Sequence, residues 1–152
     1  MSGMAQDCFW MQQALEEAKK AGIKGEVPIG AVLVKNNKKI ASAHNLTIAK
    51  NDPTAHAEIL CLRRASKRLK NVRLTGTILY VTVEPCALCA GALIWSRIKK
   101  VIFGCWDIKS GACGSVVNLS QIKQFNHHFQ CEGGILEKDS AKLLQDFFKD
   151  KR

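Results

Sequence analysis

The chain has 152 residues, with 23 lysines and arginines against 13 aspartates and glutamates and a formal net charge of +10. This length fits one domain, which can bury roughly 68–70% of its unfolded surface without disulfide or metal staples. The charge favours a polyanionic partner, either a nucleic acid or an acidic lipid surface, and composition alone does not distinguish the two.

The seven cysteines are odd in number and irregularly spaced, which argues against a disulfide framework and for a reducing compartment. Five of them are expected to be inert thiols in or near the core: Cys8, Cys61, Cys105, Cys113 and Cys131. No apolar segment approaches the roughly 20 residues of a membrane helix, and the N-terminus lacks a basic region followed by an apolar run. We therefore expect a cytoplasmic protein without a membrane partner.

The first predicted element is an amphipathic helix of about four turns that stops near Gly22. Its apolar residues recur at helical spacing: Met11, Ala14, Leu15, Ala18 and Ala21. A hairpin follows, because residues 28–34 are almost wholly apolar and residues 40–45 continue extended. Asn36 and Asn37 lie between these strands and tolerate the positive φ of a tight turn.

A second helix is predicted to begin at Pro53 and Thr54, a start signal followed by apolar residues on one side. These apolar residues are Ile59, Leu62, Ala65 and Leu69. The exposed face is strongly basic and carries Arg63, Arg64, Lys67, Arg68, Lys70 and Arg73. As a group these residues are candidates for phosphate contacts, whereas a solvated surface is the alternative for any single one.

His56 is expected in the first turn of this helix, and Glu58 lies two residues on, about 200° further around it. Both side chains can serve one site only if that site lies over the N-terminal end of the helix. Asn45, which ends the hairpin, comes close before this segment, and His44 is expected to point to the opposite face as a surface histidine.

A buried strand is predicted at residues 77–83, and a third helix is predicted to begin at Pro85. Cys86 and Cys89 are then three apart in the first turn, where free backbone N–H groups bias both thiols towards thiolate. A strand at residues 100–103 follows, so the connection is a parallel crossover. The helix between the strands is apolar on nearly all sides, which suggests that a partner subunit covers part of it.

Two thiolates at this spacing suit a soft divalent metal but need a further ligand, and His56 provides it. His56, Cys86 and Cys89 fill three positions of a tetrahedral zinc ion and leave the fourth for water, as catalytic zinc requires. Glu58 is the spare carboxylate, placed to take a proton from that water and return it to a substrate. The alternatives are a redox pair, which leaves His56 and Glu58 unexplained, and half of a structural zinc knot, which lacks an obvious fourth ligand.

Residues 104–115 form a glycine-rich loop that carries Asp107, Lys109 and Ser110. A short edge strand is expected at residues 126–131, with His127 and His128 as surface or core histidines. A last helix is predicted, capped by Asp139 or Ser140. Its apolar stripe consists of Leu143, Leu144, Phe147 and Phe148. The alternative to a functional role is core packing for Phe147 and Phe148, and the shaping of a turn for the glycines of residues 104–115.

The pattern His56-x-Glu58 with Pro85-Cys86-x-x-Cys89 resembles the zinc-dependent nucleoside and nucleobase deaminases, whose established signature it matches. The likeness runs from about Gln6 to Phe148 through GEVPIGAVLV, DPTAHAEI, LYVTVEPCALCAGA and FGCWDIKSGACGS. These strings are similar to those of the bacterial tRNA-specific adenosine deaminases. The last string is the most discriminating, because guanine deaminases partly share the other three.

This resemblance implies an α/β protein, a single deaminase domain over residues 1–152 with a cytidine-deaminase-like mixed five-stranded sheet between helices. It also implies one zinc ion per chain, a homodimer, and hydrolytic deamination of adenosine to inosine at the wobble position in a tRNA anticodon loop. A free-base guanine deaminase is the alternative among enzymes. A zinc-stabilised RNA-binding module is the alternative outside them.

The resemblance further implies a set of substrate-binding residues. Asn45 would bond the purine, with a turn residue bonded to its own backbone as the alternative. Asp107 and Lys109 would contact ribose and phosphate, Phe148 would lie beside flanking nucleotides, and Ala57 belongs to the same set.

Overall fold

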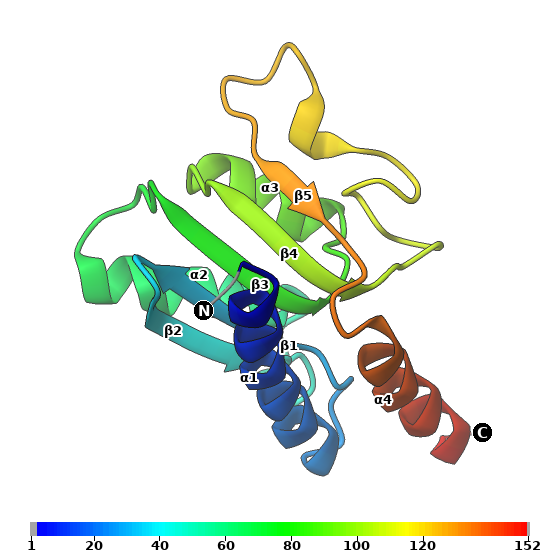
Figure 1. Cartoon of the computed structure of the whole chain (residues 1–152). Coiled ribbons are helices and arrows are strands. Elements are labelled where there is room, and N and C mark those ends of the chain that lie inside the picture. Colours follow the sequence, from blue (N-terminus) through cyan, green and yellow to red (C-terminus); the bar gives the residue numbers. More distant parts are fainter. Residues whose placement is uncertain (1–2, 152) are drawn as a thin grey trace.

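A computed structural model describes residues 3–151 and shows one mixed β-sheet between two layers of helices (Figure 1). The elements are, in chain order, α1 (Gly3–Ile23), β1 (Gly30–Lys35), β2 (Lys38–His44), α2 (Ala57–Leu69), β3 (Thr77–Val83), α3 (Ala87–Trp95), β4 (Lys100–Cys105), the 3-10 turn η1 (Leu119–Gln121), β5 (Gln130–Glu132) and α4 (Glu137–Asp150). The predicted fold class, an α/β domain with a mixed five-stranded sheet, is confirmed.

The strand order is β2-β1-β3-β4-β5. The predicted hairpin is confirmed, because β1 and β2 pair antiparallel through a turn in which Asn36 and Asn37 have φ of 51° and 58°. The predicted crossover is confirmed as well, because β3 and β4 pair parallel on either side of α3. The edge strand expected at residues 126–131 is shorter and begins later, at Gln130.

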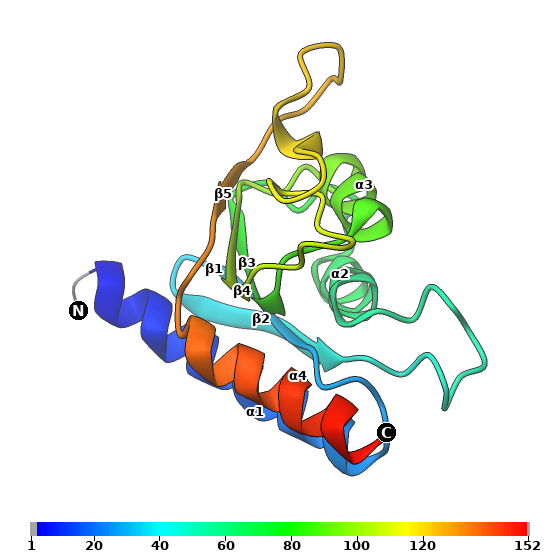
Figure 2. The ribbon, with the colours of Figure 1, turned by 90° about the vertical axis from the view of Figure 1, so that its right-hand side faces the viewer.

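Alternate side chains of the strands pack against opposite helical layers, as the period of two in a strand requires. Val32 and Tyr80 belong to the cluster that packs against α1, whereas their neighbours Leu33 and Leu79 belong to the cluster on the other face. Figure 2 shows α1 and α4 together on one face of the sheet and α2 and α3 together on the other. Both faces of the central strands are therefore buried.

The prediction of a surface position for His44 is wrong. His44 does point to the face opposite Asn45, but α1 covers that face, so only 8% of it is exposed. Its Nδ1 lies 2.9 Å from Oε2 of Glu17 on α1, and its Nε2 lies 3.0 Å from the Lys24 ammonium. Because both ring nitrogens have a polar partner, burial of the imidazole is tolerable.

Several helix boundaries differ from the predicted ones. α1 is longer than four turns and ends at Ile23, one residue beyond Gly22. α4 begins at Glu137, so Asp139 and Ser140 lie inside the helix instead of capping it. The residue at the cap is Leu136, in the left-handed conformation with φ of 53°. Inside the described range 3–151, no helix has both the length and the apolar character needed to cross a bilayer.

The five cysteines outside the motif lie in or near the core, as predicted. Burial raises the pKa of Cys61 to about 12 and that of Cys105 to about 11, which keeps both thiols protonated. A hydrogen bond with Cys131 raises the pKa of Cys113 and lowers that of Cys131.

Candidate metal centre and substrate pocket

The metal centre forms where the N-terminal ends of α2 and α3 meet. His56 and Cys86 were predicted in the first turns of these helices. Both instead lie at the N-caps, each directly before the first residue of its helix. Their backbones are extended, with φ and ψ of −73° and 152° at His56 and −78° and 179° at Cys86. Neither side chain caps its own helix, so both remain available to a ligand.

The structure brings together the three predicted ligands. Nδ1 of His56 lies 3.6 Å from Sγ of Cys86 and 3.4 Å from Sγ of Cys89. All three candidate ligand atoms lie within 4.8 Å of one another. Two thiol sulfurs and one imidazole nitrogen at such distances fit the donor set of a zinc ion and leave one tetrahedral position open.

The two thiols share a hydrogen bond that separates their acidities. It is the main reason why the pKa of Cys86 is lowered to about 5, and the His56 imidazole lowers it further. The same bond, together with burial, raises the pKa of Cys89. Cys86 is therefore the more acidic of the two thiols, and metal binding at this pair is coupled to proton release, because thiols bind metal as thiolates.

Glu58, the second residue of α2, lies beside this cluster and is only 4% exposed. Burial raises the pKa of its carboxyl group to about 7, even though the His56 ring and a hydrogen bond with Cys89 lower it. A carboxyl group with a pKa near neutrality both takes up and releases a proton readily. The proton-carrying role of Glu58 stays a prediction.

Asn45 and Ala57 are joined by a hydrogen bond at the start of α2. Oδ1 of Asn45 accepts from the backbone N of Ala57 at 2.8 Å, and both residues are buried. The bond satisfies one of the N–H groups that the first helical turn leaves without a partner. Asn45 thus fixes the helix end that carries His56 and Glu58, and the predicted contacts of Asn45 and Ala57 with substrate remain predictions.

Three other predicted substrate-binding residues line one pocket of about 730 Å³: Asp107, Lys109 and Phe148. The pocket includes Val83, which lies three residues before Cys86 in the chain, but none of His56, Glu58, Cys86 and Cys89 lines it. It also includes Ile29, whose carbonyl accepts from the backbone N of Asn45 at 3.2 Å.

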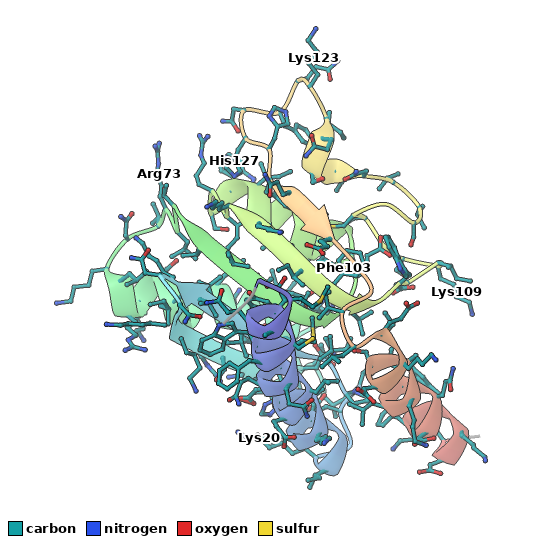
Figure 3. All side chains as sticks on the ribbon, viewed as in Figure 1. Lys20, Arg73, Phe103, Lys109, Lys123 and His127 are labelled. Atoms are coloured by element: carbon teal, nitrogen blue, oxygen red, sulfur yellow. The ribbon has the colours of Figure 1, made fainter. Side chains whose placement is uncertain are left out.

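Asp107 and Lys109 differ in how free their side chains are. Oδ1 of Asp107 accepts from the backbone N of Lys109 and of Ser110, both at 3.1 Å. One of the two carboxylate oxygens therefore stabilises the turn in which Asp107 itself lies. Lys109 projects outwards from the loop after β4, as Figure 3 shows. Phe148 is 48% exposed on α4 and contacts the ring of Phe147 edge to face.

The chain is similar to known deaminases over nearly its whole length. The family model of the MafB19-like deaminases matches residues 5–152. The chain is 49% identical over 149 residues to the tRNA-specific adenosine deaminase of Bacillus subtilis, an alignment that covers 98% of this chain and 92% of that one. It is 45% identical over 143 residues to the tRNA-specific adenosine deaminase of Haemophilus influenzae, covering 93% and 83%. The chain belongs to the tRNA-specific adenosine deaminase family.

This deaminase also resembles solved deaminase structures. One from a study of A-to-I editing by tRNA:A34 deaminases at the wobble position of transfer RNA matches with a TM-score of 0.87 and 43% identity, covering 90% of this chain and 99% of that one. The guanine deaminase of Nitrosomonas europaea matches with a TM-score of 0.78, covering 96% and 84%, but is only 22% identical. The second likeness extends to the fold alone.

The basic face of α2 in this deaminase is only partly free to meet phosphate. Arg64 donates to the carbonyl of Ser42 at 2.7 Å, and Arg68 donates to the carbonyl of Ile40 at 2.8 Å. The physical reason is that β2 is an edge strand, whose outward carbonyls need partners. In each of these two exposed arginines one guanidinium nitrogen is engaged within the chain, and the phosphate contacts of the group remain a prediction.

The sequence did not indicate the apolar wall of the pocket or the importance of Glu84, the residue before Pro85. Val27, Ile29, Trp106 and Ile108 line the pocket, although no local pattern marks them as ligand-facing. Glu84 directly follows the strand predicted at residues 77–83 and was given no role. The available signal was an acidic residue between a predicted buried strand and a predicted helix start, since a carboxylate buried at such a place needs several donors.

Proposed function

We propose that this deaminase converts adenosine to inosine at the wobble position of tRNA. The observation that carries the proposal is the placement of Glu58, a buried carboxyl group with a near-neutral pKa, beside His56, Cys86 and Cys89 at the meeting point of two helix ends. The names of the relatives and the 0.87 TM-score with a structure from the tRNA:A34 deaminase study support the substrate.

His56, Cys86 and Cys89 would hold one zinc ion, which when bound supplies the Lewis acidity that lowers the pKa of water towards about 7. Glu58 takes a proton from the attacking water and delivers it to N1 of the purine. The carboxylate then takes the remaining proton of that water, now on the hydroxyl at C6, and passes it to the 6-amino group, which leaves as ammonia, so inosine forms and the carboxylate is regenerated. The burial of Glu58 keeps these transfers away from bulk solvent.

The substrate base must leave its stack to reach the buried Glu58, so an unpaired loop nucleotide is favoured over a paired one. We assign Asn45 and Ala57 to the base, Asp107 and Lys109 to ribose and phosphate, and Phe148 to a flanking nucleotide. The net charge of +10 supports a polyanionic substrate. We place the protein in the cytoplasm, where tRNA is found and thiol ligands stay reduced.

Deamination of free guanine is the second candidate, and it is less supported because the guanine deaminases of Nitrosomonas europaea and Bacillus subtilis are 22% and 30% identical, against 49% for the tRNA-specific adenosine deaminase of Bacillus subtilis. To separate the two, zinc-loaded protein would be given an anticodon stem-loop with adenosine at the wobble position, free adenosine, and free guanine. We expect inosine from the stem-loop, very little from adenosine and no xanthine, because a tRNA enzyme uses remote binding energy to position one base. Xanthine from guanine, with the stem-loop untouched, would contradict the proposal.

We also propose that two copies of the chain associate through the outer face of α3. Trp95 is 83% exposed, and with Val72 and Leu62 it lines a groove of about 840 Å³ between α2 and α3. A large exposed apolar patch is typical of an interface. This supports the partner subunit inferred from the apolar character of α3.

Trp95→Glu is expected to convert a dimer into a monomer, because it places a charge in the centre of the groove. Sedimentation velocity measures this directly. Ile23→Glu is the matched control, since Ile23 is 87% exposed on α1 and lies outside the groove. A wild-type protein that sediments as a monomer at assay concentrations would contradict the dimer.

A further inference from the structure

Glu84 is a buried acid for which the chemistry above has no use. It follows the last residue of β3 and is 3% exposed. Its backbone N donates to the carbonyl of Cys105 at 2.9 Å, which extends the parallel pairing of β3 with β4. Within residues 3–151, no ion pair to a lysine, arginine or histidine compensates its charge.

The carboxylate is held instead by donors from one loop. Oε1 accepts from the backbone N of Asp107 at 3.0 Å and from the hydroxyl of Ser115. Oε2 accepts from the backbone N of Cys113 at 3.1 Å and from the backbone N of Ser115 at 2.9 Å. Glu84 therefore bonds both ends of the loop at residues 107–115, the loop that carries Asp107 and Lys109 into the substrate pocket.

The middle of the same loop lies against the metal centre. Gly111 pairs with Cys86 in an isolated antiparallel bridge, and the backbone N of Ala112 donates to the carbonyl of Pro85 at 2.8 Å. A side chain at Gly111 would overlap the carboxyl group of Glu84, so the loop passes directly over that group. Within residues 84–86, the side chain of Glu84 thus holds the loop, and the side chain of Cys86 is a candidate metal ligand.

We propose that Glu84 is a positioning residue that holds the loop at residues 107–115 in its substrate-binding conformation beside the metal centre. This inference rests on the proposed function for the identity of the substrate, but the loop contacts do not depend on it. When the loop is already ordered before the substrate binds, no binding free energy is lost in ordering the loop. When only a fraction of the free protein has the competent loop, the apparent affinity falls by that fraction, whereas the bound complex still reacts.

Glu84→Gln tests the proposal, because the amide keeps the shape of the carboxylate but turns one acceptor oxygen into a donor that faces backbone N–H groups. We expect faster hydrogen exchange at the amides of Asp107, Cys113 and Ser115. We also expect the KM for the stem-loop to rise by about tenfold to a hundredfold, while kcat and zinc content stay close to wild type. Glu26→Gln is the exchange control, since buried Glu26 accepts from Ile48 and Ala49 and should affect only that other loop.

Gly111→Ala is the second variant, should Glu84→Gln fold poorly. It displaces the carboxyl group without removing any hydrogen-bonding atom and is expected to raise KM and loop exchange in the same direction. A purely structural role would lower the melting temperature and the active fraction with KM and loop exchange unchanged, and that result would overturn the proposal. A wild-type protein inactive on the stem-loop would overturn the proposed function, and the exchange measurement would still decide whether Glu84 holds the loop.

Discussion

Glu58→Gln is expected to lower turnover of the stem-loop by about 10²–10⁴ fold while the zinc content stays at the wild-type value. Glutamine has nearly the same shape as glutamate but carries no exchangeable carboxyl proton, so it cannot move a proton from water to the purine. The three clustered ligand atoms come from His56, Cys86 and Cys89 and not from Glu58, so the metal should remain. Single-turnover kinetics and metal analysis on the same preparation measure both quantities.

Glu17→Gln is the matched control for this substitution. Glu17 is also a buried carboxylate, but it bonds His44 on the far side of the sheet, away from the metal centre. Its variant should retain turnover, although the lost bond lowers stability. If Glu58→Gln instead lost its zinc, Glu58 would be a ligand and its assignment as a proton carrier would be wrong.

Cys86→Ser and His56→Ala are each expected to lose the metal, and with it all measurable activity. Serine offers a weakly acidic hydroxyl in place of a thiol whose pKa is lowered to about 5. Alanine at position 56 removes the imidazole that lies within 3.6 Å of both sulfurs. Because the site joins two helix ends, metal binding also contributes to folding stability.

Thermal unfolding with and without a chelator measures this second effect. The wild type should unfold at a lower temperature once chelated, whereas the unfolding of both variants should not respond to the chelator. Cys8→Ser is the control, since Cys8 is a free, half-buried thiol on α1 outside the cluster. A Cys86→Ser protein with a full complement of zinc would contradict the ligand set.

The parts of the fold that depend on local signals could be predicted from the sequence. Asn36 and Asn37 marked a turn that the structure places at positive φ. The spacing of Cys86 and Cys89, with His56 in the first turn of another predicted helix, was enough to predict a cluster that the structure brings within 4.8 Å. The turn depends only on residues that are close in the chain. The cluster could be predicted because two thiolates need a further metal ligand.

Features set by contacts between distant segments could not be predicted. His44 is buried because a glutamate 27 residues earlier is its hydrogen-bond partner, and no pattern around His44 indicates this. Arg64 and Arg68 bond carbonyls of β2 because that strand lies at the edge of the sheet, which depends on the strand order. Glu84 is held by donors 23 to 31 residues later in the chain.

The central claim is that the site formed by His56, Glu58, Cys86 and Cys89 acts on one adenosine of a tRNA loop. Its most direct test is a stem-loop that carries two adenosines, one at the wobble position and one elsewhere in the same loop, with the inosine product located by sequencing after a single turnover. We predict inosine at the wobble position alone, with none formed by Glu58→Gln. Equal conversion of both adenosines, or conversion only at the other position, would contradict the claim.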